Sequence, residues 1–275
     1  CTPPGWIGIT DAYPLFLTGQ AAIKLDGAWL LSTFEKDIRS LAEGSYNYAA
    51  CGEDQPTPTP SADDLAALEA VDNSGSEAVA RSERAMQRRI TQARLPRRKT
   101  LEDYKFEFPK RIPKQKILRL FDCEFVSKQQ CAVFIGGTGT GKTHLLTALG
   151  YVACEKGIRV RFTRVVDMIN VLTTAQINGT LEKRLREYVR PELLLLDELG
   201  YLPIDKRGAD LMFQVVAARY ESRSTVVTTN RKFRDWGKAF DVDNTLATAM
   251  IDRLMHHGEA IVIEGGSYRT GDSKD

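Results

Sequence analysis

The 275-residue chain lacks any apolar run of the roughly 18 residues that a membrane-spanning helix needs. Its N-terminus also lacks a basic stretch leading into an apolar core, which is the mark of a secretory signal. Apolar residues make up 43% and charged residues 27% of the chain, ordinary values for a soluble globular protein. We therefore expect a cytoplasmic protein without a membrane partner.

Cysteine and histidine are scarce, with five and three residues respectively. The cysteines are scattered without a C-x-x-C pair, and no histidine stands at the usual zinc-ligand spacing. Disulfide scaffolds and zinc knuckles both need closely spaced ligands of these types. We therefore expect reduced thiols, and neither a disulfide framework nor a zinc knuckle.

Charge is distributed unevenly, although the net charge is only +2. Residues 1–80 carry 12 acidic and 3 basic side chains, whereas residues 81–119 carry 4 acidic and 14 basic ones. A concentrated basic segment is typical of proteins with a polyanionic partner, although a solvated basic linker has the same composition. We predict a basic arm over residues 81–119.

Composition divides the chain into four parts. Residues 1–53 form an N-terminal segment of uncertain origin, and residues 54–80 combine the Pro/Thr-rich linker DQPTPTP with an acidic helical segment. After the basic arm, residues 120–275 alternate apolar β-rich runs with amphipathic helical stretches. This alternation predicts an α/β fold, a parallel sheet with helices on both faces, preceded by a largely helical or irregular segment.

The motif GGTGTGKT at residues 136–143 has the P-loop pattern G-x-x-x-x-G-K-[ST], between an apolar run and a helical stretch. Glycines let backbone N–H groups turn toward phosphates, and the N-terminus of the next helix adds positive potential. Lys142 is expected to reach the β- and γ-phosphates of ATP, and the Thr143 hydroxyl to bind Mg²⁺. The predicted nucleotide-binding residues are Gly136, Gly137, Thr138, Gly139, Thr140, Gly141, Lys142, Thr143 and the adjoining His144, which we expect to pack or cap without a catalytic role.

Polar residues follow two further apolar runs. Asp197 and Glu198 end the run LLLLDE, so Asp197 is predicted to hold Mg²⁺ through its water shell and Glu198 to act as general base on the attacking water. The alternative is an acidic pair that merely ends a buried strand, but its occurrence with a P-loop favours catalysis. Asn230 ends the run STVVTTN and is a candidate to position that water, the alternative being an asparagine in a turn.

Over about residues 83–270 the chain resembles the IstB-like ATPases, AAA+ helper proteins of insertion-sequence transposition that are related to DnaC-type helicase loaders. The matching stretches are GGTGTGKTHLLTALG, EKGIRVRFTR, NGTLEKRLREYVRPELLLLDELGYLP, GADLMFQVVAARYESRSTVVTTN, DWGKAF, LATAMIDRLMHHG and GGSYR. The resemblance implies a P-loop AAA+ ATPase. It also implies that Arg253 corresponds to the family's arginine finger, which acts on a neighbouring subunit's γ-phosphate, and Arg269 to its sensor arginine. For either arginine alone, a surface salt bridge is the alternative.

The resemblance further implies an ATP-dependent DNA-binding helper that recruits a transposase and directs target choice. Its expected partners are duplex DNA, a transposase and further copies of itself, and its cofactors are ATP and Mg²⁺. A DnaC-like helicase loader in DNA replication shares the same motifs, and a nucleotide switch without hydrolysis is a second alternative. The stretches LGYLP and DRLMHHG favour transposition, and the intact P-loop and acidic pair argue against a switch.

The predicted DNA contacts are basic residues in two clusters. No aromatic residue interleaves the first cluster, which favours phosphate-backbone contact over base stacking. The candidates are Arg88, Arg89, Arg94, Arg97, Arg98, Lys99, Lys183, Arg184 and Arg186.

One short stretch, residues 16–31, is similar to an internal part of bacterial extracellular solute-binding proteins. About 50 residues cannot rebuild a binding cleft that needs two lobes, so we do not expect sugar binding. The two explanations that we weigh are a gene fragment joined to a truncated helper ATPase and a lineage-specific N-terminal extension.

Overall fold

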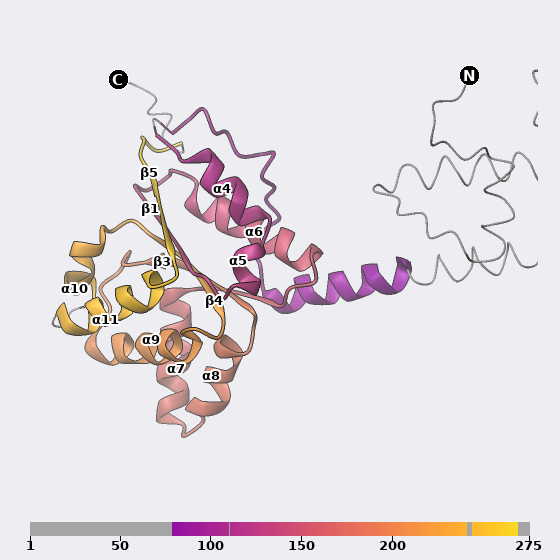
Figure 1. Ribbon diagram of the computed structural model, residues 1–275. Helices are drawn as coiled ribbons and strands as arrows, with labels where there is room; N and C mark the ends of the chain where they lie inside the picture. Colours follow the sequence, from indigo (N-terminus) through magenta and orange to yellow (C-terminus); the bar gives the residue numbers. More distant parts are fainter. Residues whose placement is uncertain (1–78, 110, 241–243, 269–275) are drawn as a thin grey trace, which may run out of the picture. The chain divides into compact units, whose positions relative to one another are not determined.

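A five-stranded parallel sheet organises the part of the chain that the computed structural model describes, residues 79–109, 111–240 and 244–268 (Figure 1). Its strands are β1 (Ala132–Gly136), β2 (Val160–Arg164), β3 (Leu193–Leu199), β4 (Ser224–Thr229) and β5 (Glu259–Ile263). They lie in the order β2-β3-β4-β1-β5. This confirms the predicted α/β fold. The expectations for residues 1–78 and for Arg269 fall outside the described residues.

Helices follow the strands as the alternating pattern predicts. They are α4 (Lys114–Phe121), α5 (Glu124–Ser127), α6 (Lys142–Glu155), α7 (Val165–Ile177), α8 (Leu181–Val189), α9 (Lys206–Arg219), α10 (Trp236–Ala239) and α11 (Asn244–Met255), with a 3₁₀ turn at Phe233–Asp235 and a helix over residues 79–93 before them. No helix in the described ranges combines the length and apolarity needed to cross a membrane.

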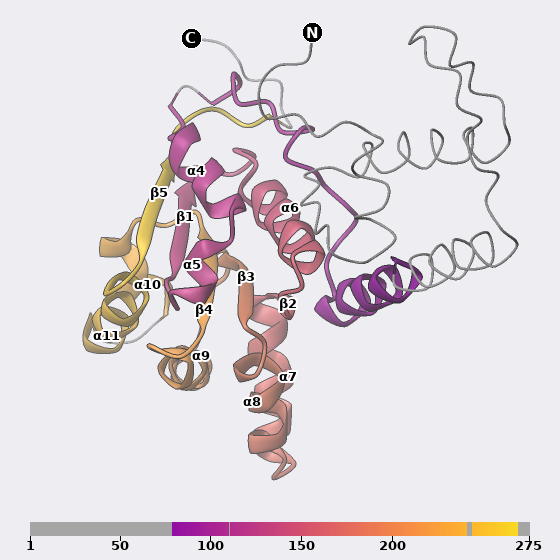
Figure 2. The ribbon, with the colours of Figure 1, turned by 45° about the vertical axis from the view of Figure 1, so that its right-hand side comes forward.

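Each face of the sheet carries its own hydrophobic core, because successive side chains of a strand point to opposite faces. In β1, Phe134 packs in the core that α4, α5 and α6 cover, whereas Val133 and Ile135 pack in the core of α7, α9 and α11. Figure 2 shows these two groups of helices on either side of the strands. Because all five strands are parallel, their carboxyl ends meet at one edge of the sheet, where ligands of such sheets bind.

The helix over residues 79–93 docks against α6, although most of its side chains are exposed. Ala93 at its end is fully buried, and Leu95 packs so closely on Gly150 that a Cβ there would lie 2.4 Å from Leu95 Cδ2. Arg89 Nε donates to the Cys154 carbonyl at 2.9 Å. The basic arm is therefore anchored to the helix that begins at the P-loop.

Arg219, at the end of α9, is only 1% exposed and joins three elements. Its guanidinium donates to the carbonyls of Tyr188 and Pro191, in and after α8, and its Nε donates to Thr225 Oγ1 in β4. Burial lowers the pKa of Arg219, whereas the surrounding carbonyl oxygens favour its charged form. The contacts fix the loop that leads into β3.

Candidate nucleotide-binding site

The P-loop connects the end of β1 to the start of α6. Gly139 and Gly141 have φ angles of +81° and +87°, which favour glycine. A Cβ on Gly139 would lie 2.1 Å from Ser267 Oγ, and one on Gly141 would lie 2.5 Å from Tyr104 Cε2. Both positions thus require glycine for backbone conformation and for close packing.

Lys142 is the first residue of α6, and its ammonium group lies against the loop. Its Nζ donates to the carbonyls of Gly136 at 2.9 Å and of Gly137 at 2.6 Å. The amino group is thus already held where the loop turns, within reach of phosphates that would replace these carbonyls. This geometry fits the predicted role of Lys142.

Thr143 and Asp197 meet across the sheet edge. Thr143 Oγ1 donates to Asp197 Oδ1 at 3.1 Å, and Thr228 Oγ1, from β4, donates to the same oxygen. Asp197 is 2% exposed, and it forms no ion pair with any described residue. A hydroxyl beside a buried carboxylate is the hard-oxygen donor set that Mg²⁺ prefers, so the residues fit the predicted metal.

Glu198 lies at an irregularity near the end of β3. Its φ is +64°, in a region that costs a non-glycine residue about 1–3 kcal/mol, and the register between β3 and β4 shifts here. Thr228 Oγ1 accepts from the Glu198 N–H at 3.0 Å, and Thr229 Oγ1 donates to the Leu199 carbonyl at 2.9 Å. These hydroxyls hold the kink, and the Glu198 side chain stays exposed.

Thr143, Asp197 and Glu198 line one cavity of about 430 Å³. Arg161 and Arg164 of β2 also line it, together with Arg94 from the end of the first described helix. The structure therefore brings the predicted metal ligands and the predicted general base to one space.

Two segments distant in sequence contact the P-loop: one around Tyr104, outside the matching stretches, and one at Tyr268, within the stretch GGSYR. Tyr104 donates its hydroxyl to the Thr140 carbonyl at 3.0 Å, and burial raises the pKa of Tyr104 to about 12, so it remains a donor. On the other side, Tyr268 N–H donates to the Gly139 carbonyl at 3.1 Å, and its ring meets Phe108 edge-on at 4.9 Å. These contacts link regions far apart in sequence, so local patterns carry little signal for them.

His144 follows the P-loop and contacts the first of these segments. Its Nε2 lies 2.7 Å from the Thr100 carbonyl oxygen, and its ring packs edge-on against Tyr104 at 5.5 Å. The histidine thus holds the segment that covers the loop.

Asn230 follows β4 directly, and its Oδ1 is buried without a hydrogen-bond partner among the described residues. Arg253 lies elsewhere: its Nη1 donates to the Ala249 carbonyl, and its guanidinium lies 4.8 Å from the Phe213 ring centre. Arg253 lines a pocket that contains no P-loop residue. The structure therefore does not bring Arg253 to the chain's own nucleotide loop.

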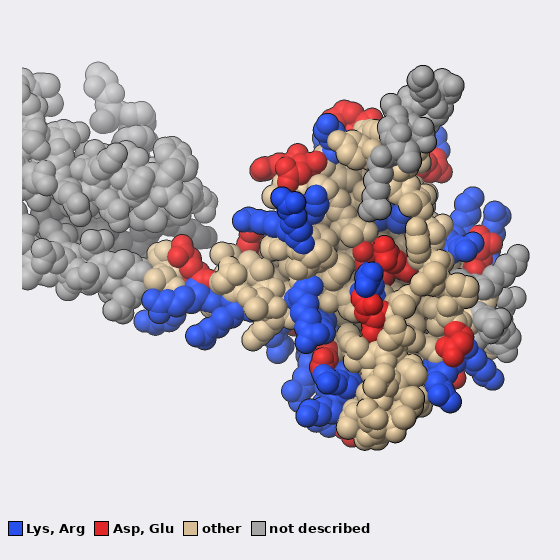
Figure 3. All heavy atoms as spheres, turned by 180° about the vertical axis from the view of Figure 1, so that it is seen from behind, with Lys and Arg blue, Asp and Glu red and all other residues tan. Residues whose placement is uncertain are grey.

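The predicted DNA-contact residues divide into exposed and engaged side chains. Figure 3 shows Lys and Arg side chains along the projecting helix and over the adjoining body. Those exposed within the first cluster are Arg88, Arg94, Arg97, Arg98 and Lys99. Arg98 nevertheless pairs with Glu155 at 3.4 Å. In α8, Lys183 is exposed, Arg184 pairs with Glu187 and Arg186 with Glu182.

The sequence model of the IstB-like ATP binding proteins matches residues 41–275. The chain belongs to the IstB-like ATP binding protein family. The match begins at residue 41, so it includes residues 41–53 of the N-terminal segment. It confirms the resemblance inferred from the motifs and extends it toward the N-terminus.

Individual relatives of this IstB-like chain come from insertion sequences. It is 43% identical over 178 residues to the insertion sequence IS232 putative ATP-binding protein of Bacillus thuringiensis subsp. berliner, covering 65% of this chain and 71% of the relative. It is 41% identical over 189 residues to the IS21 putative ATP-binding protein of Pseudomonas aeruginosa, covering 69% and 71%.

Solved structures share the fold. A DnaC helicase loader superposes with a TM-score of 0.50 at 25% identity, covering 60% of this chain and 96% of the loader. AMPPCP-bound DnaA from Aquifex aeolicus gives a TM-score of 0.52 at 24% identity, covering 62% of this chain and 51% of DnaA. These similarities confirm the AAA+ type of P-loop fold.

Proposed function

We propose that this IstB-like chain binds ATP with Mg²⁺, hydrolyses it, and uses the cycle to control assembly on duplex DNA during insertion-sequence transposition. The observation that carries the proposal is the contact between Thr143 and Asp197, with Glu198 lining the same cavity. A P-loop hydroxyl beside a buried carboxylate and an exposed glutamate is the arrangement that phosphoryl transfer to water needs.

Each residue of the site has a distinct proposed role. The backbone of the P-loop and Lys142 bind the phosphates, and Thr143 and Asp197 hold Mg²⁺, which when bound neutralises charge on the β- and γ-phosphate oxygens. Glu198 accepts a proton from the attacking water, because its carboxylate is exposed to the cavity and carries no ion pair with a described residue. Asn230 orients that water, which would satisfy its buried amide oxygen.

Arg253 acts on a neighbouring copy in this proposal. Its guanidinium is placed on α11 by Phe213 and the Ala249 carbonyl, away from the chain's own P-loop. A guanidinium spreads the negative charge that develops on the transferred phosphoryl group. Hydrolysis would therefore depend on assembly. Arg269, outside the described residues, is proposed to close on the subunit's own nucleotide.

The proposed polymer partner is duplex DNA, and the proposed protein partner is a transposase. Exposed arginines and lysines from residue 88 to residue 99 offer phosphate contacts without aromatic side chains between them. The relatives that match over two thirds of their length are ATP-binding proteins of insertion sequences, which supports transposition as the setting.

A helicase loader is the second candidate, favoured by the coverage of 96% of the DnaC chain. Both candidates need ATP, so ATP turnover alone does not separate them. The two candidates are separated by a comparison of two binding measurements. One is binding of the purified chain to a transposase from its own insertion sequence, and the other is binding to a replicative helicase of the same host. Helicase binding without transposase binding overturns the leading proposal.

The ATPase part is tested by steady-state hydrolysis with and without duplex DNA, on the parental chain and on Asp197→Asn. We expect Mg²⁺-dependent turnover that DNA stimulates, and loss of most turnover in the variant because the buried carboxylate is removed. Asp235→Asn, a change at a half-exposed carboxylate outside the cavity, is the control. Equal turnover in parental chain and Asp197→Asn excludes the proposed metal site.

A further inference from the structure

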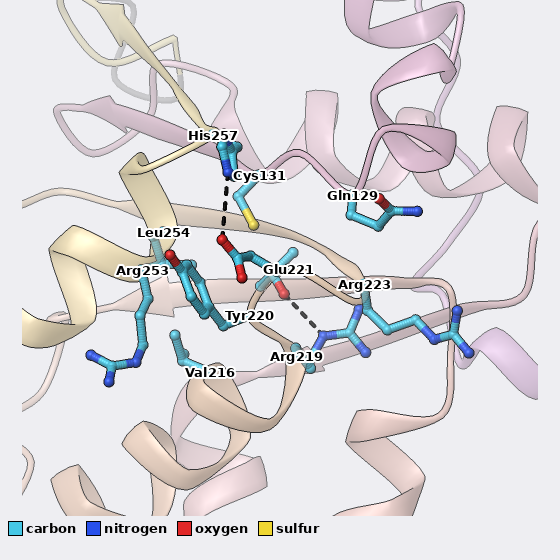
Figure 4. A pocket seen from close by; sticks show the side chains of 11 residues that line it. Gln129, Cys131, Val216, Arg219, Tyr220, Glu221, Arg223, Arg253, Leu254 and His257 are labelled. Carbon is cyan, nitrogen blue, oxygen red and sulfur yellow. Dashed lines mark hydrogen bonds and ion pairs between the residues drawn. The ribbon is translucent and has the colours of Figure 1, made fainter.

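Two histidines and a glutamate converge on the surface at the ends of α9 and α11. Oε1 of Glu221 lies 3.7 Å from Nδ1 of His256 and 3.7 Å from Nε2 of His257. One side-chain atom from each residue lies within 4.8 Å of the other two. Figure 4 shows His257 directed at the Glu221 carboxylate.

The fold builds this cluster from separate parts of the chain. Glu221 follows α9 by two residues and has a φ of +54°, and the two histidines follow the last residue of α11. Tyr220 OH hydrogen-bonds the same Nδ1 of His256 at 2.6 Å, and a metal ion bound through that nitrogen would replace this hydrogen bond. The ends of α9 and α11 therefore bring the backbone of the three residues together, and the ring centroids of His256 and His257 lie 4.1 Å apart.

The donor set selects a class of ion. Two imidazoles and one carboxylate suit Zn²⁺ and neighbouring transition metals, whereas Mg²⁺ and Ca²⁺ prefer oxygen ligands alone. Zinc bonds of about 2.0–2.1 Å in a tetrahedral site place ligand atoms roughly 3.4 Å apart. The 3.7 Å separations are close to that value.

We propose that Glu221, His256 and His257 form a binding site for a transition-metal ion of the Zn²⁺ class, separate from the nucleotide site. Three protein ligands leave a fourth position open to water or to a donor from another molecule. The alternative for the same geometry is an ion pair between Glu221 and a protonated histidine, without metal.

The site would connect two helices that place Arg253. The Tyr220 ring lies 5.9 Å from the Arg253 guanidinium, and Tyr220 precedes Glu221 in the chain. An ion bound to Glu221 and to both histidines therefore links the end of α9 to the end of α11, the helix that carries Arg253. The metal-binding claim stands on the ligand geometry and does not depend on the proposed ATPase function.

The test is a Co²⁺ and Zn²⁺ titration of the full chain, with any purification tag removed and without nucleotide. We expect one ion per chain, seen as the visible absorption of bound Co²⁺ and its displacement by Zn²⁺. Removing one ligand in His256→Ala, His257→Ala or Glu221→Gln should weaken affinity by at least about tenfold, the lower end of effects measured around metal sites.

The chain offers matched controls, because it has three histidines. His144→Gln removes the histidine that contacts Thr100, and Asp235→Asn removes a carboxylate outside both sites; neither should change Co²⁺ affinity. Glu221 is half exposed, so Glu221→Gln should fold, and Zn²⁺ should raise the melting temperature of the parental chain but not of this variant. No saturable binding, or binding that survives Glu221→Gln and His257→Ala, overturns the proposal.

Discussion

The Thr143 hydroxyl lies 3.1 Å from Oδ1 of Asp197, a contact between residues 54 positions apart that joins the P-loop to the end of β3. Thr228 Oγ1 reaches the same carboxylate oxygen from β4. The proposed Mg²⁺ site is thus formed by three elements at one edge of the sheet, the P-loop, β3 and β4. Its Mg²⁺ dependence should therefore change with the residues that hold Asp197 as well as with Asp197 itself.

Lys142→Ala should abolish measurable nucleotide binding. The ammonium group held by the Gly136 and Gly137 carbonyls is the cation that the P-loop offers to the phosphates. Charge-assisted hydrogen bonds contribute about 1.5–3 kcal/mol each, so the loss of two should weaken ATP affinity at least about 100-fold. Fluorescent-nucleotide titration measures this, with Lys128→Ala, at an exposed lysine directly after α5, as control. Unchanged affinity in Lys142→Ala would remove the basis of the P-loop assignment.

Glu198→Gln should keep ATP affinity and lower turnover by about 10²-fold or more, the scale of general-base loss. The backbone kink at Glu198 depends on its N–H and on Thr228, so the amide side chain should leave the local structure intact. Single-turnover hydrolysis and nucleotide titration on the same preparation separate the two effects. Glu182→Gln, on the exposed side of α8, is the matched control. Hydrolysis at the parental rate in Glu198→Gln would mean that another group is the base.

Thr228→Val should impair turnover although Thr228 lies outside the P-loop and the acidic pair. The substitution removes a donor to Asp197 and an acceptor for the Glu198 N–H, and it leaves a buried carboxylate oxygen short of one hydrogen bond. We expect the unfolding free energy to fall by about 1–3 kcal/mol and the Mg²⁺ concentration for half-maximal turnover to rise. Thr228→Ser retains the hydroxyl and should restore both quantities. A valine variant with parental Mg²⁺ dependence contradicts the positioning role.

The parallel sheet and the strand-end chemistry could be predicted because both follow local patterns. Alternating apolar runs and helical stretches place the carboxyl ends of parallel strands together, which brings Asp197 to Thr143. The contacts that distant residues make with the P-loop could not be predicted in this way. Tyr104 and Tyr268 reach the P-loop from positions more than 30 residues and more than 120 residues away in the sequence. Nothing in the residues around Tyr104 specifies that approach, whereas Tyr268 belongs to GGSYR, the stretch that carries the expected sensor arginine.

Thr228 and the Glu221–His256–His257 cluster illustrate the same limit. A threonine near the end of an apolar strand is typical of β-structure, and its double contact with β3 depends on strand register. The two histidines lack zinc-ligand spacing in sequence, and their carboxylate partner comes from another helix end. Contacts of this kind arise from packing, so they appear only once the fold is known.

Arg253→Ala should lower hydrolysis without weakening ATP binding to the isolated subunit, because Arg253 lies away from the chain's own P-loop. A mixture of two variant chains tests whether the nucleotide site is formed between subunits. An Arg253→Ala chain combined with a Lys142→Ala chain should recover part of the parental turnover, since one chain supplies the nucleotide and the other the guanidinium. An assembled mixture without recovery argues against a site formed between subunits.

The basic arm should give duplex binding a steep salt dependence. If six phosphates are contacted, log affinity should fall with log salt at a slope of about −5. Arg94, Arg97 and Lys99 are exposed, whereas Arg89 is occupied with the Cys154 carbonyl. Neutralising these three of the exposed basic residues should therefore reduce the slope by roughly 3, while deletion of residues 1–78 should leave it unchanged.

The paired arginines of α8 provide the internal comparison for that experiment. Arg184 and Arg186 each contact a glutamate of the same helix, so recruiting them to phosphate means giving up an existing ion pair. Their joint replacement by glutamine should change the slope by less than neutralisation of Arg94, Arg97 and Lys99. Duplex binding is measured against salt with ATP present. An unchanged slope after neutralisation of the arm, with a reduced slope after the α8 substitutions, would move the DNA contact from the arm to α8.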